Sequence, residues 1–124
     1  MKEIMDQLRS LDELHYLFIE KQDRTVAHCL ELDLVAVGGD KKIAEKRLNV
    51  VVTAQIVGAY TSGNFDALFF RAPEKLWHEL ERAEKLAKTY LRFKTRPPMV
   101  LPVEQRQLSL RLPVYRAIAP AAAA

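Results

Sequence analysis

The chain has 124 residues, of which 49% are hydrophobic and 28% are charged, and its formal net charge is +3. This length suits one domain with its own core, and the apolar content predicts a folded chain rather than a disordered one. No stretch approaches the roughly 20 consecutive apolar residues that cross a bilayer, and residues 1–10 lack the apolar run of a secretion signal. A single cysteine, Cys29, excludes an intramolecular disulfide. These features predict a soluble protein of the reducing cytoplasm.

The charge is distributed unevenly along the chain. Residues 1–40 hold four Lys/Arg against nine Asp/Glu, a balance of −5, whereas residues 73–124 hold ten against five. An acidic front can attract a basic partner, and a basic C-terminal part can contact nucleic acid. Both parts are equally consistent with ordinary solvated surfaces, or with mutual attraction inside an oligomer.

A series of short strands is the first clear pattern. Before it, Met1–Leu14 spaces apolar residues at helical intervals and predicts a short helix. Three segments rich in aromatic, β-branched and aliphatic side chains then follow, at residues 14–20, 25–30 and 34–37. Polar residues separate them, and Gly38-Gly39 closes the last one. We therefore expect an antiparallel meander of three strands.

Two helices are expected after the meander. Asp40 is placed to cap the first, because its carboxylate can accept hydrogen bonds from the free N–H groups of the first turn. The apolar face of this helix continues to a stop signal at residues 61–64. Pro73 is suited to open a second helix, whose apolar stripe reaches Tyr90. Phe65–Phe70 is predicted as a fourth strand between the two helices.

The C-terminal part predicts a connector and a further strand. Residues 94–104 contain three prolines and predict an extended connector. Gln107–Leu112 alternates polar and apolar residues and predicts a strand with one buried face. The expected fold is α+β in the order β-β-β-α-β-α, with an antiparallel sheet of three or four strands, helices on one face, and an added C-terminal strand. Residues 1–93 form this domain, and residues 105–124 hold the last strand and an Ala-rich tail.

Residues for catalysis or metal binding form no recognisable motif. The candidate metal ligands are His15, His28, Cys29 and His78, and no two of them have ligand spacing. His28 and Cys29 are adjacent, so on a strand their side chains point to opposite faces. Cys29 would need a positioned base to act as a nucleophile, and as a small apolar residue of a strand it needs none. We expect no metal, no cofactor and no catalytic residue.

Acidic residues leave one enzymatic alternative open. A metal-dependent nuclease would need three or four carboxylates converging on one point. Glu31 and Asp33 share a strand face, but Asp23 belongs to a turn and Asp40 to a helix cap. Convergence of these groups is therefore not expected from the sequence, and the nuclease stays an alternative to a binding protein.

Residues 26–38, VAHCLELDLVAVG, resemble the core of the HicB-like family, whose members are antitoxins, and antitoxin-like single domains, of bacterial toxin–antitoxin pairs. The family pattern is a strand hairpin, a passage similar to this one, and a helix that opens with a capping residue and an Ala. Asp40 takes the capping position and Ala44 the Ala position, so that the resemblance covers about residues 14–62. Lys42-Ile43 stand where the family has paired acids, and the hairpin turn lacks its usual Gly.

The resemblance implies a degenerate ribonuclease-H-like domain that is not catalytic and that covers a small basic RNA-cleaving toxin. Charge alone suggests which residues would meet such a partner: Glu20, Asp23, Glu31 and Asp33. Family members that repress their own genes carry a C-terminal DNA-binding module. Residues 106–113 are similar to the opening strand of a ribbon-helix-helix module, but the chain stops without room for its two helices. Direct DNA binding through such a module is therefore not expected.

The C-terminal strand is instead expected at an interface between copies of the chain. Leu108, Leu110 and Leu112 are the residues predicted to form this interface, in a dimer or a tetramer. The sequence thus predicts a non-catalytic HicB-like protein-binding domain. Two alternatives remain open: a stand-alone homo-oligomer with an unidentified ligand, and the metal-dependent nuclease.

Overall fold

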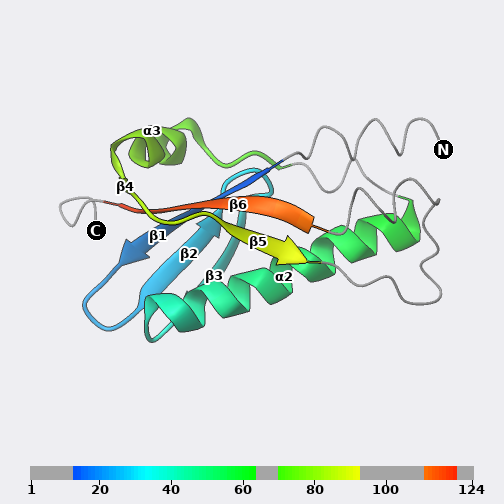
Figure 1. The fold of residues 1–124 in the computed structure, drawn as a ribbon, viewed down its shortest axis with the longest axis horizontal. Coiled ribbons are helices and arrows are strands. Elements are labelled where there is room, and N and C mark those ends of the chain that lie inside the picture. Colours follow the sequence, from blue (N-terminus) through cyan, green and yellow to red (C-terminus); the bar gives the residue numbers. More distant parts are fainter. Residues whose placement is uncertain (1–12, 64–69, 93–110, 120–124) are drawn as a thin grey trace.

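The computed structural model describes residues 13–63, 70–92 and 111–119. They form one mixed sheet and two helices (Figure 1). The strands are β1 (Leu14–Glu20), β2 (Thr25–Cys29), β3 (Leu34–Gly38), β4 (Glu84–Lys85), β5 (Thr89–Arg92) and β6 (Arg111–Ile118), and the helices are α2 (Lys41–Ser62) and α3 (Glu74–Arg82). The predicted α+β class is therefore confirmed.

The strands β1, β2 and β3 form the antiparallel meander that the sequence predicts. Across β1 and β2, Glu20 pairs with Thr25, and across β2 and β3, Cys29 pairs with Leu34. The backbone N–H of Lys21 donates to the Arg24 carbonyl at 2.7 Å and closes the first turn. The hairpin thus forms although its turn lacks a glycine.

Asp40 caps α2 as predicted. Its Oδ1 accepts a hydrogen bond from the backbone N–H of Ile43 at 2.8 Å. The helix ends at Gly63, whose φ of 71° is the left-handed conformation that glycine adopts without a Cβ clash. At the end of β3, a Cβ added to Gly38 would lie 2.5 Å from the backbone N of Ala44. This close approach positions the first turn of α2 against the edge of the meander.

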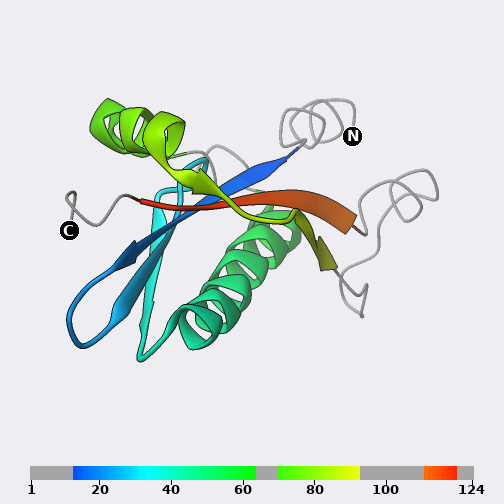
Figure 2. The ribbon, with the colours of Figure 1, turned by 60° about the vertical axis from the view of Figure 1, so that its left-hand side comes forward.

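The two helices pack on opposite faces of the sheet (Figure 2). Tyr16 and Phe18 of β1 belong to the main core cluster, which includes the buried face of α2. Leu17, between them, belongs to a second cluster, which α3 covers with Leu76, Trp77 and Leu80. The expectation that both helices share one face is wrong, because β1 is apolar on both sides and the burial of Leu17 requires a second cover.

β6 lies inside the sheet, between β1 on one side and β4 and β5 on the other. It runs parallel to β1, with Leu14 opposite Val114 and Phe18 opposite Ile118. The sheet is therefore mixed, whereas the sequence predicts a purely antiparallel sheet. The C-terminal strand belongs to the same sheet as the meander, so that residues 111–118 are part of the domain and not an appended segment.

α3 is shorter than predicted. Ala83 already has an extended backbone, with a ψ of 151°. Lys85 then pairs with Ala117, and Leu91 pairs with Leu112. The prediction of a helix that reaches Tyr90 is wrong because hydrogen bonding to β6 and burial of Leu91 outweigh local propensity. The ion pairs at i and i+4 that a longer helix would form, such as Glu81 with Lys85, are worth only about 0.2–0.5 kcal/mol each.

Several predicted features lie outside the described residues. They are the helix at residues 1–12, most of the strand Phe65–Phe70, the connector 94–104, and the side chains of Leu108 and Leu110. Phe70 is described and does not belong to a strand. Neither α2 nor α3, the helices of the described ranges, is both long enough and apolar enough to span a bilayer.

Candidate functional site

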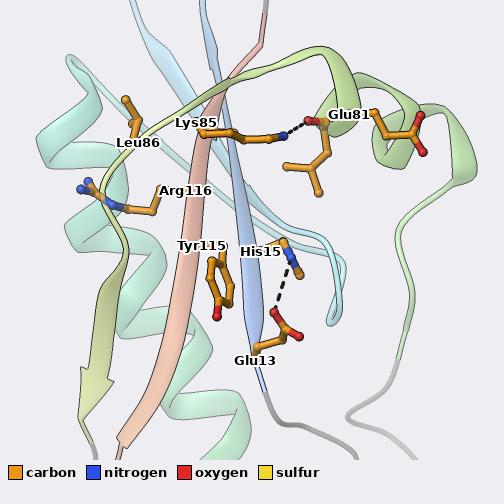
Figure 3. Close-up of a pocket in the computed structure, with 9 residues that line it drawn as sticks. Glu13, His15, Glu81, Lys85, Leu86, Tyr115 and Arg116 are labelled. Carbon is orange, nitrogen blue, oxygen red and sulfur yellow. Dashed lines mark hydrogen bonds and ion pairs between the residues drawn. The ribbon is translucent and has the colours of Figure 1, made fainter.

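A pocket of about 410 Å³ opens between α3 and the strands β1, β4 and β6 (Figure 3). It is lined by Glu13, His15, Leu80, Glu81, Lys85, Leu86, Tyr115, Arg116 and Ala117. Its volume falls within the range of about 300–1,000 Å³ that is usual for small-molecule sites. The lining is mainly apolar, with charged groups of both signs around it.

His15 is the most constrained side chain of this pocket. Glu31 accepts two hydrogen bonds from it, one from the backbone N–H at 2.7 Å and one from the ring Nδ1 at 2.5 Å. The Nε2 atom lies 3.7 Å from the Glu13 carboxylate. The hydrogen bond to Glu31 raises the pKa of His15 above 6.5, although burial opposes this shift. His15 therefore keeps its ring proton to a higher pH than a free histidine does.

Two aromatic rings hold the imidazole of His15 in place. Tyr115 stacks on it, with ring centroids 5.5 Å apart and an interplanar angle of 24°, and Trp77 meets it edge-on at 5.8 Å. The indole N–H of Trp77 donates to the Ala72 carbonyl at 3.1 Å, which fixes the indole in turn. Tyr115 remains 41% exposed. The imidazole thus supports a tyrosine ring that is accessible to solvent.

A second histidine–carboxylate pair stabilises the turn between β2 and β3. His28 Nε2 lies 2.6 Å from Asp33 Oδ1. Asp33 has a φ of 51°, in the left-handed region that aspartate tolerates better than most residues. Since Glu31 binds His15, both acidic residues of this turn are held by histidines of neighbouring strands.

The four acidic residues predicted to meet a basic partner do not form one patch. Glu20 and Asp23 are exposed where β1 turns into β2. Glu31 and Asp33 follow the opposite end of β2. The five residues of β2 separate the two pairs, a length of roughly 17 Å in an extended chain.

The buried titratable groups of the core are not activated for catalysis. Burial raises the pKa of the Cys29 thiol to about 12 and holds the pKa of Tyr16 well above its usual range. The Tyr16 hydroxyl donates to Asn49 Oδ1 at 2.8 Å. Both groups therefore stay protonated at neutral pH. Within the described residues, no three His, Cys, Asp or Glu side chains gather as a metal site would require.

Leu112 is the described member of the three leucines predicted at an oligomer interface. It is partly buried and packs against the main core cluster, opposite Leu91 of β5. Further along β6, Arg116 binds Glu45 of α2 at 3.1 Å and the Ala87 carbonyl at 3.0 Å. This strand therefore contributes to the core of its own chain.

A second candidate surface lies on the outer side of α2. Ile43, Val50 and Val51 are 42%, 66% and 38% exposed, and Ala54 is also exposed. At 3.6 residues per turn these four residues fall within about 100° around the helix axis; we call them the α2 stripe. Residues 48–63 carry no charged side chain. The exposed side chain of Arg47 lies within the same arc, one turn after Ile43, and beyond Arg47 the outer side of the helix carries no charge.

The sequence does not predict the pocket. Its pattern identifies His15 only as a candidate metal ligand without a second ligand at a suitable spacing. The pairing of Tyr16 with Cys29 brings Glu31 beside His15, and that register is the signal that could have joined them. Tyr115 falls beyond the predicted end of the C-terminal strand. Its signal is the apolar alternation of Leu112 and Val114, which continues through Pro113.

Comparison of the chain with protein-family models, with curated proteins and with solved structures finds no match.

Proposed function

We propose that this chain is a non-catalytic, HicB-like protein-binding domain of the cytoplasm. The segment that resembles the family, about residues 14–62, corresponds to β1–β3 and α2. Asp40 caps this helix and Ala44, in its first turn, is fully buried, in keeping with the positions that the resemblance assigns to them. The one cysteine, Cys29, is buried and protonated, which favours binding over nucleophilic catalysis.

The observation that carries this proposal is the α2 stripe. Exposed aliphatic side chains that gather on one surface mark protein contacts, because burying them against a partner removes apolar area from water. Val35 and Val37 of the edge strand β3 are also exposed, at 48% and 42%. Arg47 donates to the Val37 carbonyl at 2.8 Å and so occupies an acceptor of this edge. This bond favours side-chain packing on the stripe over the addition of a partner strand to β3.

The partner implied by the resemblance is a small basic toxin that cleaves RNA. Glu20 and Asp23 would offer it negative charge, but Lys21 and Arg24 in the same turn offset that charge. The other two acidic candidates are held by histidines. The apolar stripe therefore supports a protein partner more strongly than the acidic residues support a basic one.

A stand-alone homo-oligomer is the second candidate, and the same stripe favours it. A two-fold axis would place two α2 helices side by side and antiparallel. Val50 of each copy could then face the small residue Ala54 of the other, and Lys46 would face the uncharged second half of the partner helix. Such a contact would bury the stripe without a different protein.

The test is affinity purification of the tagged full chain from host lysate, combined with light scattering of the purified protein. We expect the wild type to retain a protein partner in near-equal amount and Val50→Glu to lose it. Gln55→Glu, which adds the same charge at an exposed position outside the stripe, is the matched control. A folded Val50→Glu variant that keeps its partner would reject the stripe. The second candidate would be supported if the wild type retains no other protein and is oligomeric, and if the Val50→Glu variant is monomeric.

The acidic residues need a separate variant. Glu20→Lys combined with Asp23→Lys should weaken a basic partner, most clearly at low salt, while the fold stays intact. Unchanged affinity would remove the β1–β2 turn from the interface. A wild-type chain that is monomeric and retains no protein would overturn both candidates.

A further inference from the structure

We propose that the sheet face around Tyr90 and Tyr115 binds single-stranded nucleic acid. This face lies on the same side of the sheet as α3 and is separate from the α2 stripe, so that the inference does not depend on the proposed protein partner.

Two tyrosines project from neighbouring strands on this face. Tyr90 pairs with Pro113 across β5 and β6. Tyr115 lies two residues further along β6, so both side chains are on the same side of the sheet. Residues in this diagonal relationship are about 7–8 Å apart. The two residues are 40% and 41% exposed, so both reach the surface of this face.

His15 extends the row of rings onto a third strand. It pairs with Tyr115 across β1 and β6 and stacks against its ring (Figure 3). Rings on adjacent strands of a sheet provide the stacking platform on which several protein folds hold successive bases of a single strand. Because every base has a flat π-face, such a platform tolerates many sequences.

Positive charge lies directly beside the rings. Lys88 Nζ is 5.4 Å from the ring centroid of Tyr90 and 5.7 Å from that of Tyr115. The ammonium therefore lies over both rings and is close enough to meet the phosphate of a base that stacks there. Arg92 is exposed on the same face of β5 as Tyr90. Lysine and arginine contacts to phosphates supply most of the sequence-independent affinity for nucleic acids.

The pocket beside Tyr115 sets the direction of the strand. Its mainly apolar lining and its volume of about 410 Å³ suit a planar base. Glu13 and Glu81 lie there, 3.7 Å from a nitrogen of His15 and 3.9 Å from a nitrogen of His78. Carboxylates can accept hydrogen bonds from the amino groups of a base but repel phosphate. We therefore expect a base to enter the pocket and the phosphates to follow β5 toward Lys88 and Arg92.

The side-chain chemistry separates this face from a protein-binding surface. On α2 and β3 the large exposed apolar side chains are valines and an isoleucine. Around β5 and β6 they are tyrosines accompanied by cations. Residues 73–124 also hold ten Lys/Arg against five Asp/Glu. Aromatic rings interleaved with cations match the stacked bases and charged backbone of nucleic acid.

The experiment is fluorescence anisotropy of the full chain with labelled oligo(U) and oligo(dT), each of about 12 nucleotides, within the ~4–16 nucleotides that one such site occupies. A duplex of equal length is the control ligand. We expect the single strands to bind more tightly than the duplex. Tyr90→Leu and Tyr115→Leu should each weaken binding about tenfold, as expected for the loss of one stacked base, while Tyr90→Phe and Tyr115→Phe should bind like the wild type.

The salt dependence tests the phosphate contact. Lys88→Gln should reduce the slope of log affinity against log salt by about 0.7, the value for one phosphate contact on a single strand. Lys42→Gln, which removes an exposed lysine of α2, should leave the slope unchanged. A preference for oligo(U) would identify RNA as the ligand, a preference for oligo(dT) would identify DNA, and equal affinity would support both.

Several results would overturn the proposal. They are absence of binding to either single strand, tighter binding to the duplex, and unchanged affinity in leucine variants that circular dichroism shows to be folded. If the leucine variants do not fold, an unchanged salt slope in Lys88→Gln would overturn the proposal instead. A wild type that binds no oligonucleotide, and that loses a co-purified protein on Tyr115→Leu, would make the face a protein site instead.

Discussion

The carboxylate of Glu31 holds His15 at two points, the backbone N–H at 2.7 Å and the ring Nδ1 at 2.5 Å. The side chains are only 26% and 19% exposed, so that water screens this charge-assisted bond less than it screens a pair on the open surface. The bond joins the start of β1 to the turn that follows β2. It also fixes the imidazole against Tyr115, and the pocket therefore depends on it.

Glu31→Gln should lower the pKa of His15. A group whose pKa is raised by folding contributes stability that is fully present below its unfolded pKa, here 6.5, and that is lost as the pH rises through the folded value. The wild type should therefore be more stable than Glu31→Gln by about 1 kcal/mol near pH 6, and the difference should shrink at alkaline pH. NMR titration of the His15 ring protons measures the pKa, and urea unfolding near pH 6 and at alkaline pH measures the difference in stability.

Glu13→Gln is the matched control for this variant. Its carboxylate lies 3.7 Å from His15 Nε2 and its side chain is 48% exposed, so we expect a smaller fall in the pKa of His15. An identical His15 pKa in the wild type and in Glu31→Gln would show that the bond to Glu31 does not set the protonation of this histidine.

Gly38→Ala should destabilise the fold by about 1–3 kcal/mol, the usual cost of overpacking a tight contact. The added Cβ would lie 2.5 Å from the backbone N of Ala44 and 2.9 Å from the carbonyl carbon of Ile43. These are backbone atoms, which no change of rotamer can move. Gly39→Ala is the control, since its Cβ would meet nothing within 4 Å. Equal unfolding midpoints for the two variants would contradict the proposed close approach.

Local signals in the sequence were sufficient to predict the meander and α2. The residue types of Asp40 and Gly63 already indicate their roles. An N-cap needs a side-chain acceptor, and a left-handed C-cap favours glycine. The turn that Lys21 and Arg24 close needs only a backbone hydrogen bond. These features involve residues within a few positions of each other, and propensity and patterning describe such features well.

The second half depends on contacts between residues far apart in the chain. Leu91 directly follows a segment that the apolar pattern predicts as helix, yet in the structure it pairs with Leu112 in the sheet. β6 meets β1 across about a hundred residues, and no local pattern states that the two run parallel. The pocket inherits this difficulty, because His15 and Tyr115 become neighbours only through that pairing. The sequence singled out Glu31 and Asp33 by their charge alone, and it did not show that they bind His15 and His28 within the chain.

Asp40→Ala should cost about 0.5–2 kcal/mol, because the first turn of α2 loses the acceptor for the Ile43 N–H. Asp40→Asn keeps an oxygen at the same position and should lose less than Asp40→Ala. Thermal unfolding followed by circular dichroism compares the three proteins. A midpoint for Asp40→Ala that equals the wild-type value would mean that Asp40 does not stabilise the helix.

Glu45→Ala should be among the more damaging substitutions on α2. Glu45 and Arg116 bind at 3.1 Å with side chains only 16% and 17% exposed, and this ion pair joins α2 to β6 across the core. Its loss leaves a guanidinium that is partly buried without its counter-charge, and we expect a cost of roughly 1.5–3 kcal/mol. Arg116 keeps its bond to the Ala87 carbonyl, which should confine the damage to the contact between helix and strand.

The matched control is Glu74→Ala, which removes the exposed pair between Arg71 and Glu74, with side chains 61% and 69% exposed. Water screens such a pair, and its loss should cost less than about 1 kcal/mol. Urea unfolding in low and high salt distinguishes the two sites. Added salt should leave most of the Glu45→Ala deficit in place, because the pair lies largely out of solvent, and should remove most of any Glu74→Ala deficit. Equal costs for the two variants would show that burial of the Glu45–Arg116 pair adds nothing to its contribution.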